Sequence, residues 1–397
     1  MPAPSHEFDA SMIRRAVRLA MNGRGYVEPN PMVGCVIVKD GRVIGEGFHA
    51  KFGEAHAEPT ALASCTESTE GATAYVTLEP CCHTNKKTPP CAPRLIAAKI
   101  ARVVIGCLDP NPKVDGKGVA MLREAGIDVT PGVLEAEAKQ LIAPFIARTT
   151  YLKPYVTLKW AETADGKIAG SCGARLQISN RESTRLVHQL RARSETIAVG
   201  IGTVLKDNPL LTARDVPNSR QLARLVLDSR ARTPLHSKLV QDVGGACVDI
   251  FVSTHDPDAL ERSVALARVK HVTITPCDSK ETHEIPLQDV LNHAFTLTST
   301  HLLVESGQIL ARSFFKAGLV DRVWVFRSPS PVNDSTAPSA TSVPADYPAS
   351  GACDLVGDSL TEYLNHASPV FFAAEPSADF VLACENVLPL PHPRPSV

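Results

Sequence analysis

The chain has 397 residues, with 41 Lys and Arg against 42 Asp and Glu and a formal net charge of −1. This balance argues against a protein that holds nucleic acid through broad neutralisation of phosphates. Hydrophobic residues make up 44% of the chain, as in ordinary globular proteins, and at roughly 100–200 residues per domain the length predicts two or three domains. No apolar run reaches the roughly 18 residues of a membrane helix, and the first residues lack the pattern of an export signal. We therefore expect a cytoplasmic protein without a membrane span.

The first 150 residues alternate between helical and strand-like patterns. Apolar residues over 13–20 have the spacing of an amphipathic helix. The pair Asp40-Gly41 between two apolar runs predicts a β-hairpin. Strand-like and helix-like segments then alternate, as in a layered α/β domain with some parallel strands: 73–78, 92–100, 102–108 and 118–126.

A second alternating series begins near residue 155, and we place the domain boundary near 145–154. It predicts another α/β domain, with strand-like segments and intervening helices at 181–194, 196–204, 224–229, 248–254, 257–269, 271–276, 301–306, 308–318 and 321–326. Residues 328–350 are rich in Ser, Pro, Thr and Ala and nearly lack large apolar side chains. Such a segment gains little from burial, so it is predicted to be a mobile loop or linker.

The 11 cysteines do not form the pattern of a disulfide framework, because their number is odd and they are thinly spread. We expect mostly free thiols in a reducing compartment. Cysteines in apolar runs, such as Cys35 in VGCVIV, are interpreted as small buried side chains. Cys81, Cys82 and Cys91 are different, because they stand in polar, proline-rich sequence.

The residues best suited to chemistry lie in GEAHAEPTALA and TLEPCCHTNKKTPPCAPRL. His56, Cys81 and Cys91 suit tetrahedral zinc with water in the fourth position. Zinc lowers the pKa of such a water to about 7. Glu58, two residues after His56, is placed to shuttle protons. Pro59 indicates that a helix begins here, because proline fits the first turn.

Zinc deaminases carry H-x-E with P-C-x-x-C, but here nine residues separate Cys81 from Cys91. A closed structural zinc site, with Cys82 or His83 as fourth ligand, is the alternative. We favour the open catalytic site, because Glu58 would have no role in a closed one. A zinc-stabilised nucleic-acid-binding module is disfavoured by the neutral charge and by an aromatic content of only 5%.

Three segments, Asn30–Gly41, Gly53–Glu58 and Thr77–Cys91, resemble the bifunctional riboflavin-biosynthesis deaminase/reductase family through NPMVGCVIVKDG, GEAHAE and TLEPC…TPPC. The resemblance implies a cytidine-deaminase-like α/β/α layered domain over 1–148. It also implies zinc-dependent hydrolytic deamination of 2,5-diamino-6-(5-phosphoribosylamino)pyrimidin-4(3H)-one. The family's stretch between the cysteines is one residue shorter, so Cys82 rivals Cys81 as a ligand, although Cys81 follows Glu-Pro as in the family.

The resemblance also implies substrate contacts in the deaminase half. A lysine there could balance the substrate phosphate and an asparagine could bind ribose or the ring edge, while the other interpretations are a solvated lysine pair and a cap of the Asn-Pro turn. Where the family often has a second histidine, this chain has Thr60. The implied contacts are Asn30, His49, His83, Lys87 and Thr88.

The second half contains Gly200-Ile201-Gly202, which does not complete the G-x-G-x-x-G fingerprint of a Rossmann domain. It resembles the reductase half of the same family, which is similar to dihydrofolate reductase. The resemblance implies a dihydrofolate-reductase-like α/β domain over 153–326 that uses NADPH to reduce the ribose to ribityl. The low-complexity segment and the last strand or tail of that domain would occupy 327–397.

The implied reductase site has two groups of residues. Two arginines of the substrate group would hold the phosphate through bidentate guanidinium contacts, although Arg191 could instead lie on a solvated helix face and Asp207 could be a turn residue. The implied cofactor contacts are Thr163, Ser179, Thr203, Asp207, Ser229, Gly307, Gln308, Ile309, Leu310, Ala311, Arg312 and Ser313. The implied substrate contacts are Arg191, Leu211, Arg214 and Glu305.

This half departs from the family pattern in three places. Residues 177–180 read QISN instead of a tryptophan-containing stretch, Ser306-Gly307 replaces a glycine pair, and 327–329 begin the low-complexity stretch. A deaminase with an inactive reductase half is therefore the alternative function, and the last strand is expected around 379–387. We expect zinc and NADPH as cofactors, a small phosphorylated pyrimidine as substrate, a homo-oligomer, and no nucleic-acid or membrane partner.

Overall fold

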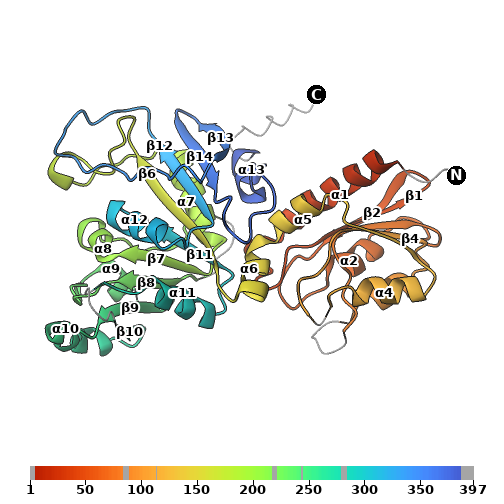
Figure 1. Cartoon of the computed structure of the whole chain (residues 1–397), viewed down its shortest axis with the longest axis horizontal. Coiled ribbons are helices and arrows are strands. Elements are labelled where there is room, and N and C mark those ends of the chain that lie inside the picture. Colours follow the sequence, from red (N-terminus) through yellow and green to blue (C-terminus); the bar gives the residue numbers. More distant parts are fainter. Residues whose placement is uncertain are drawn as a thin grey trace, which may run out of the picture. The chain divides into compact units, whose positions relative to one another are not determined.

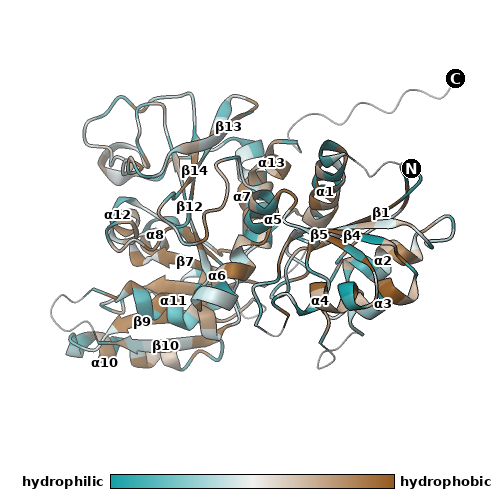
Figure 2. Ribbon diagram, turned by 45° about the vertical axis from the view of Figure 1, so that its right-hand side comes forward, coloured by the Kyte–Doolittle hydropathy of each residue, from teal (hydrophilic) through white to brown (hydrophobic). Residues whose placement is uncertain are grey.

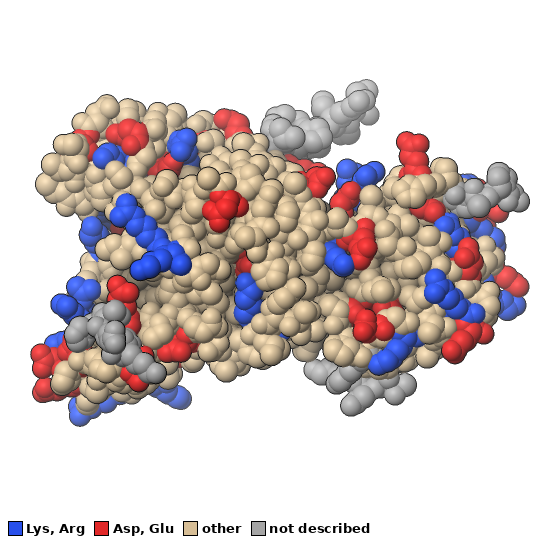
Figure 3. Space-filling model, in the orientation of Figure 1, with Lys and Arg blue, Asp and Glu red and all other residues tan. Residues whose placement is uncertain are grey.

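The computed structural model describes residues 5–83, 89–112, 114–216, 221–242, 245–278 and 284–385. The chain folds into two compact units, Met1–Leu152 and Lys153–Val397 (Figure 1). Within the described ranges, none of the helices combines the length and hydropathy that a membrane span requires. On the face drawn in Figure 3, basic and acidic side chains are interspersed.

The first unit is built on a sheet that has five strands in the described residues, in the order β2-β1-β3-β4-β5. The predicted hairpin is confirmed: β1 and β2 are antiparallel, and both turn residues, Asp40 and Gly41, have positive φ. β1 is antiparallel to β3, whereas β3, β4 and β5 run parallel. The strands are β1 (Gly34–Lys39), β2 (Arg42–Phe48), β3 (Thr73–Leu78), β4 (Arg102–Cys107) and β5 (Asp128–Pro131).

Helices cover both faces of this sheet, which gives the expected α/β/α layers. Ile13 of the first helix packs with Val36 and Tyr75 on one face. On the other face, Ala61 and Leu95 pack against the strand side chains that alternate with those of the first face. The helices are α1 (His6–Met21), α2 (Ala57–Ala63), α3 (Cys91–Ala97), α4 (Lys117–Glu124), α5 (Glu135–Leu141) and α6 (Ala143–Tyr151).

The second unit contains a larger sheet, with nine strands in the part that the structure describes. Its order is β10-β9-β8-β7-β11-β6-β12-β14-β13. The first seven strands in this order run parallel to one another, whereas β14 is antiparallel to both of its neighbours, β12 and β13. Figure 2 shows the buried strands β7 and β9 in hydrophobic colours. The strands are β6 (Tyr155–Glu162), β7 (Thr196–Gly200), β8 (Ala223–Leu227), β9 (Val248–Ser253), β10 (Val272–Cys277), β11 (His301–Glu305), β12 (Arg322–Arg327), β13 (Ala349–Leu355) and β14 (Asp358–Leu364).

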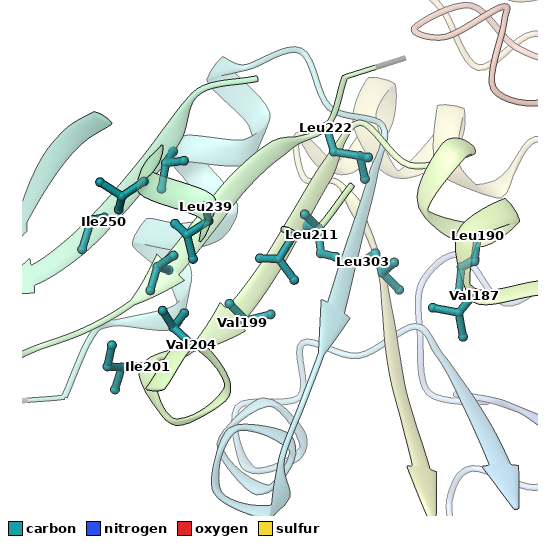
Figure 4. Packing of buried hydrophobic residues seen from close by; sticks show 14 of the residues in the cluster. Val187, Leu190, Val199, Ile201, Val204, Leu211, Leu222, Leu239, Ile250 and Leu303 are labelled. Atoms are coloured by element: carbon teal, nitrogen blue, oxygen red, sulfur yellow. The ribbon is translucent and has the colours of Figure 1, made fainter. Parts of the chain in front are cut away.

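Two apolar clusters lie on the two faces of the larger sheet. One contains Leu190, Val199, Val204 and Leu303, which Figure 4 labels among the side chains of this cluster. The other packs α11 and α12 against strand side chains that include Trp160. The helices are α7 (Arg181–Ala192), α8 (Ile201–Asp207), α9 (Lys238–Gln241), α10 (Pro257–Ala267), α11 (Leu287–Thr296), α12 (Gln308–Lys316) and α13 (Ala378–Glu385), with a short 3₁₀ turn at Ser171–Gly173.

The segment predicted to be mobile, 328–350, is instead packed against the loop after β6. Asp165 accepts hydrogen bonds from the backbone N–H groups of Val332 (3.0 Å) and Asn333 (2.9 Å). Tyr347 is buried and its hydroxyl donates to the Val320 carbonyl. Polar side chains therefore order a segment whose composition offered little apolar area.

The last strand was predicted in the wrong place. Residues 379–385 lie in the helix α13, and the sheet is completed by the hairpin of β13 and β14. A short apolar run is compatible with either a strand or a buried helix, so its periodicity did not decide between them. Cys353 of β13 and Cys384 of α13 form a disulfide, whereas the other described cysteines are free thiols.

Candidate functional site

Three short segments of the first unit bring His56, Cys81 and Cys91 together. His56 is the extended residue before α2, Cys91 is the first residue of α3, and Cys81 lies in the loop after β3. The Nδ1 atom of His56 is 3.7 Å from Sγ of Cys81 and 3.5 Å from Sγ of Cys91. Zn–S bonds of about 2.3 Å and Zn–N bonds of about 2.0 Å at a tetrahedral angle give N···S edges of about 3.5 Å. The donor set and its spacing therefore fit a tetrahedral zinc ion.

In the part of the chain that the structure describes, this cluster has three protein ligands and no fourth. Among the described residues, the His, Cys, Asp and Glu side chains close enough to share a metal are His56, Cys81 and Cys91. The rival Cys82 is partly exposed and lies outside the cluster. A three-ligand set leaves one tetrahedral position for water or substrate, as in catalytic zinc sites.

Glu58 lies beside the cluster, in the first turn of α2, and its side chain is almost fully buried. Burial, and next the nearby Cys81 sulfur, raise the pKa of the Glu58 carboxyl. A carboxyl group with a raised pKa accepts and releases a proton closer to neutral pH. This environment suits the predicted role in proton transfer.

The predicted substrate residues Asn30 and His49 lie next to the metal cluster. The rings of His49 and His56 have centroids 5.1 Å apart. Nδ1 of His49 faces the Ala55 carbonyl oxygen at 2.9 Å, so in the neutral ring Nδ1 carries the proton and Nε2 accepts from the Asn30 amide at 3.2 Å.

Three further predicted residues of this half follow the cysteine pair in the sequence. His83 is partly buried just after the cysteine pair, and Lys87 and Thr88 lie outside the described residues. Thr60, which stands where the family often has histidine, donates its hydroxyl to the His56 carbonyl oxygen at 2.7 Å. At this position the chain therefore supports the backbone of a cluster residue.

In the second unit, a cavity of about 300 Å³ lies between α7, α8 and the loop that follows α8. Five predicted residues line it: Ser179, Arg191, Asp207, Leu211 and Arg214. Asn180 caps α7 by accepting from the Ser183 N–H, which fixes the helix that carries Arg191.

Arg191 is not on a solvated helix face, because its side chain is only 12% exposed. It forms a two-pronged ion pair with Glu305, with N···O distances of 2.6 and 2.9 Å, and also donates to the Thr212 carbonyl. Burial by itself would raise the pKa of Glu305, but Arg191 and Lys159 outweigh burial and lower this pKa to about 2. Arg214 is exposed at the cavity and is therefore the freer of the two guanidinium groups.

Lys159 of β6 also lines this cavity, and the sequence reasoning missed it. Its ammonium lies 5.6 Å from the centroid of the Phe326 ring. Burial lowers the pKa of Lys159, while Glu305 opposes this shift. The signal in the sequence was a lysine between the apolar residues Leu158 and Trp160 of the strand.

Apart from Ser179, which lies just before α7, the predicted cofactor residues follow the carboxyl ends of four parallel strands. Thr163 follows β6, Thr203 and Asp207 lie on α8 after β7, and Ser229 follows β8, while Gly307–Ser313 open α12 after β11. Parallel strands end at the same edge of a sheet, which is the usual ligand edge of open α/β sheets. The Thr163 hydroxyl donates to Asp165 at 2.5 Å and accepts from the Lys167 N–H, so its side chain also stabilises the turn after β6.

Two family models match the chain. Residues 6–107 match the cytidine and deoxycytidylate deaminase zinc-binding region, and residues 154–341 match the RibD C-terminal domain. Two curated relatives are both named riboflavin biosynthesis protein RibD. The protein from Aquifex aeolicus is 40% identical over 325 residues, covering 81% of this chain and 87% of the relative. The protein from Actinobacillus pleuropneumoniae is 41% identical over 340 residues, covering 85% and 89%.

Solved structures of two proteins are similar to this chain over nearly its whole length. RibD of Acinetobacter baumannii superposes with a TM-score of 0.77 at 33% identity, covering 91% of this chain and 99% of that chain. A Thermotoga maritima diaminohydroxyphosphoribosylaminopyrimidine deaminase/5-amino-6-(5-phosphoribosylamino)uracil reductase superposes with a TM-score of 0.76 at 35% identity and the same coverage. The fold class expected for both halves is confirmed by these similarities.

Proposed function

Because the chain belongs to the RibD family of bifunctional riboflavin-biosynthesis enzymes, we propose that its two activities are carried by the residues gathered at the two sites described above. The enzyme is a zinc-dependent deaminase and an NADPH-dependent reductase. It deaminates 2,5-diamino-6-(5-phosphoribosylamino)pyrimidin-4(3H)-one and then reduces the ribose to ribityl. The observation that carries the residue assignment is the cluster of one partly buried histidine and two buried cysteines, with a buried carboxyl group beside it.

In the deaminase unit, His56, Cys81 and Cys91 would hold zinc. When bound, the ion supplies a Lewis acid that activates water for attack on the ring carbon bearing the amine. Glu58 would take a proton from the attacking water and deliver it to the leaving amine, so that water is consumed and ammonia is released. Asn30 and His49, already hydrogen bonded to each other, would orient the pyrimidine.

In the reductase unit, the nicotinamide supplies the hydride and the chain binds and orients the two reactants. The residues after β6, β7, β8 and β11 would hold NADPH, with the N–H groups that open α12 directed at a phosphate. The Arg191–Glu305 ion pair would shape the substrate end of the cavity, and Arg214 would contact the substrate phosphate. The comparisons give no support to an inactive reductase half.

One coupled assay tests these assignments. Ammonia release and NADPH oxidation are followed together on the diaminopyrimidine substrate, for the wild type and for Glu58→Ala. We expect the variant to retain zinc and to lose ammonia release, while NADPH oxidation with the deaminated intermediate persists. Unchanged ammonia release in Glu58→Ala would exclude the proton-transfer role of Glu58.

The cellular setting follows from the same function. We expect the enzyme to act in the cytoplasm as a homo-oligomer on a small phosphorylated pyrimidine, without a nucleic-acid partner. The free thiols of nine of the described cysteines suit a reducing compartment. Light scattering on the purified protein measures its oligomeric state, and fractionation of cells measures its location.

A further inference from the structure

Glu79 is a buried carboxylate that neither the sequence reasoning nor the proposed chemistry uses. It stands two residues before Cys81, and its side chain is 3% exposed. Its Oε2 atom accepts hydrogen bonds from the N–H groups of Asp109 (3.3 Å) and Gly116 (2.9 Å), and its Oε1 atom accepts from Val119 N–H (3.1 Å). Hydrogen bonds to an ionised acceptor are roughly twice as strong as neutral ones.

These three donors belong to the start of α4 and to the segment that leads into it. Gly116 is the residue before the helix, and Val119 lies in its first turn. The first N–H groups of a helix have no partner within the helix, and they carry a partial positive charge. The Glu79 carboxylate therefore supplies the acceptor that this helix end requires.

The backbone next to Glu79 is pressed against the same helix. A Cβ atom placed on Gly118 would lie 2.1 Å from the Pro80 carbonyl oxygen, so α4 approaches the loop as closely as glycine allows. On its other side, the Cys81 carbonyl oxygen accepts from the N–H groups of Cys91 (3.0 Å) and Ala92 (3.1 Å). The loop that carries Cys81 is thus in contact with α4 on one side and hydrogen bonded to the start of α3 on the other.

Glu79 also binds backbone on both sides of Val114 in the sequence. The same carboxylate oxygen accepts hydrogen bonds from the N–H groups of Asp109 and Gly116. The fully buried Val114 packs with Cys81 and Cys91. The carboxylate therefore stabilises both the loop that carries Cys81 and the backbone near an apolar side chain that packs on the cluster.

We infer that Glu79 is a positioning residue for the metal centre, acting through Cys81 and Val114. The inference rests on the proposed role of His56, Cys81 and Cys91 as zinc ligands. Groups that orient metal ligands from outside the coordination sphere typically change metal affinity or activity by about 10–100-fold when they are mutated. Glu79 has the contacts of such a group, because each of its three hydrogen bonds ends on backbone that fixes the cluster.

Two variants together separate the effect of position from the effect of charge. In Glu79→Gln the amide keeps the shape but replaces one acceptor oxygen with a donor that faces an N–H group, so a positioning role predicts weaker zinc binding. Removal of a nearby negative charge also lowers the attraction for a cation, so a pure charge effect would weaken zinc binding in this variant or leave it unchanged. Glu79→Asp keeps the charge but shortens the reach, so only a positioning role predicts weaker zinc binding in this second variant.

The experiment measures zinc affinity by competition with a chelator, together with the thiolate-to-metal charge-transfer spectrum of the Co²⁺-substituted enzyme. We expect both variants to bind zinc about 10–100-fold more weakly and to change the spectrum. If Glu79→Gln yields little folded protein, Glu79→Asp supplies the same comparison. NADPH oxidation with the deaminated intermediate reports on folding of the other unit, and we expect it to be unchanged.

Asp9→Asn is the matched control. Asp9 is also a buried carboxylate, and it accepts from Tyr75 and Arg102 on the face of the sheet that α1 covers. This variant should lower stability without changing zinc affinity or the Co²⁺ spectrum.

Three results would overturn the inference: zinc affinity and spectrum unchanged in both Glu79 variants, weaker zinc binding in Glu79→Gln with normal binding in Glu79→Asp, or the same loss in Asp9→Asn. The proposed function is tested separately with Cys91→Ser. If this variant keeps the zinc affinity and spectrum of the wild type, the ligand assignment fails. If it loses zinc while both Glu79 variants bind normally, only the positioning role fails.

Discussion

The buried ion pair between Arg191 and Glu305 should contribute measurably to the stability of the second unit. The pKa of Glu305 is lowered from 4.5 to about 2, and one pKa unit corresponds to about 1.4 kcal/mol, so the ionised carboxylate is stabilised by about 3 kcal/mol. Removing one partner of a buried pair typically lowers the free energy of unfolding by about 3–5 kcal/mol. We therefore expect Glu305→Gln to destabilise the second unit by about 3 kcal/mol.

Tryptophan fluorescence isolates this unit, because both tryptophans of the chain, Trp160 and Trp324, lie within it. Urea titrations of Glu305→Gln, Arg191→Met and the double variant form a double-mutant cycle that measures the coupling between the two side chains. Glu182→Gln is the control, because Glu182 pairs with Arg185 on the same helix but both side chains are about one-third exposed. We expect this control to change stability by less than about 1 kcal/mol.

The sign of the pH dependence follows from the direction of the shift. The pKa of Glu305 is lower in the folded state, so its stabilisation is present above about pH 4.5 and is lost as the pH falls toward 2. The difference in the free energy of unfolding between the wild type and Glu305→Gln should therefore decrease as the pH falls from about 4.5 toward 2. Single losses that simply add in the double variant, or a difference that is independent of pH between 4.5 and 2, would refute the reasoning.

Two further predictions concern cysteines. Cys81→Ser should lose tightly bound zinc, measured by metal analysis after dialysis, whereas Cys82→Ser should keep it; the reverse result would identify Cys82 as the ligand. Cys384→Ser should lower the stability of the second unit, because the bond between Cys353 and Cys384 closes a loop of 31 residues, for which chain entropy gives about 3–4 kcal/mol. Urea midpoints from tryptophan fluorescence, measured with and without a thiol reductant, test this prediction. The reductant should lower the midpoint of the wild type but not that of the variant. Equal midpoints for wild type and variant without the reductant would contradict the prediction.

Local sequence signals were sufficient where the structure depends on neighbours in the chain. Asp40-Gly41 specified the hairpin because the turn needs two residues with positive φ. His56 was correctly placed at a helix start because Pro59 fits the first turn of α2. Signals of this kind did not decide between helix and strand for 379–385, where a short apolar run fits both.

The missed residues share a physical reason. Glu79 and Lys159 each occupy a position that reads as part of a strand or its end, and their partners come from distant segments. A charged residue is stable in a buried position only when it is paired or hydrogen bonded. The sequence shows the buried charge but does not reveal which distant groups compensate it.

The same argument explains why the two sites differed in how well they could be predicted. The metal cluster uses two stretches whose backbone is set locally: His56 precedes a helix with proline in its first turn, and Cys91 follows Pro90, which precedes α3 in an extended conformation. The reductase cavity instead depends on the pairing of Arg191 with Glu305, 114 residues away. Both side chains were predicted as substrate contacts, but the sequence did not predict that they pair with each other. In that unit, the order of the parallel strands determines which strand ends are neighbours, and so which of the proposed contact residues lie near one another.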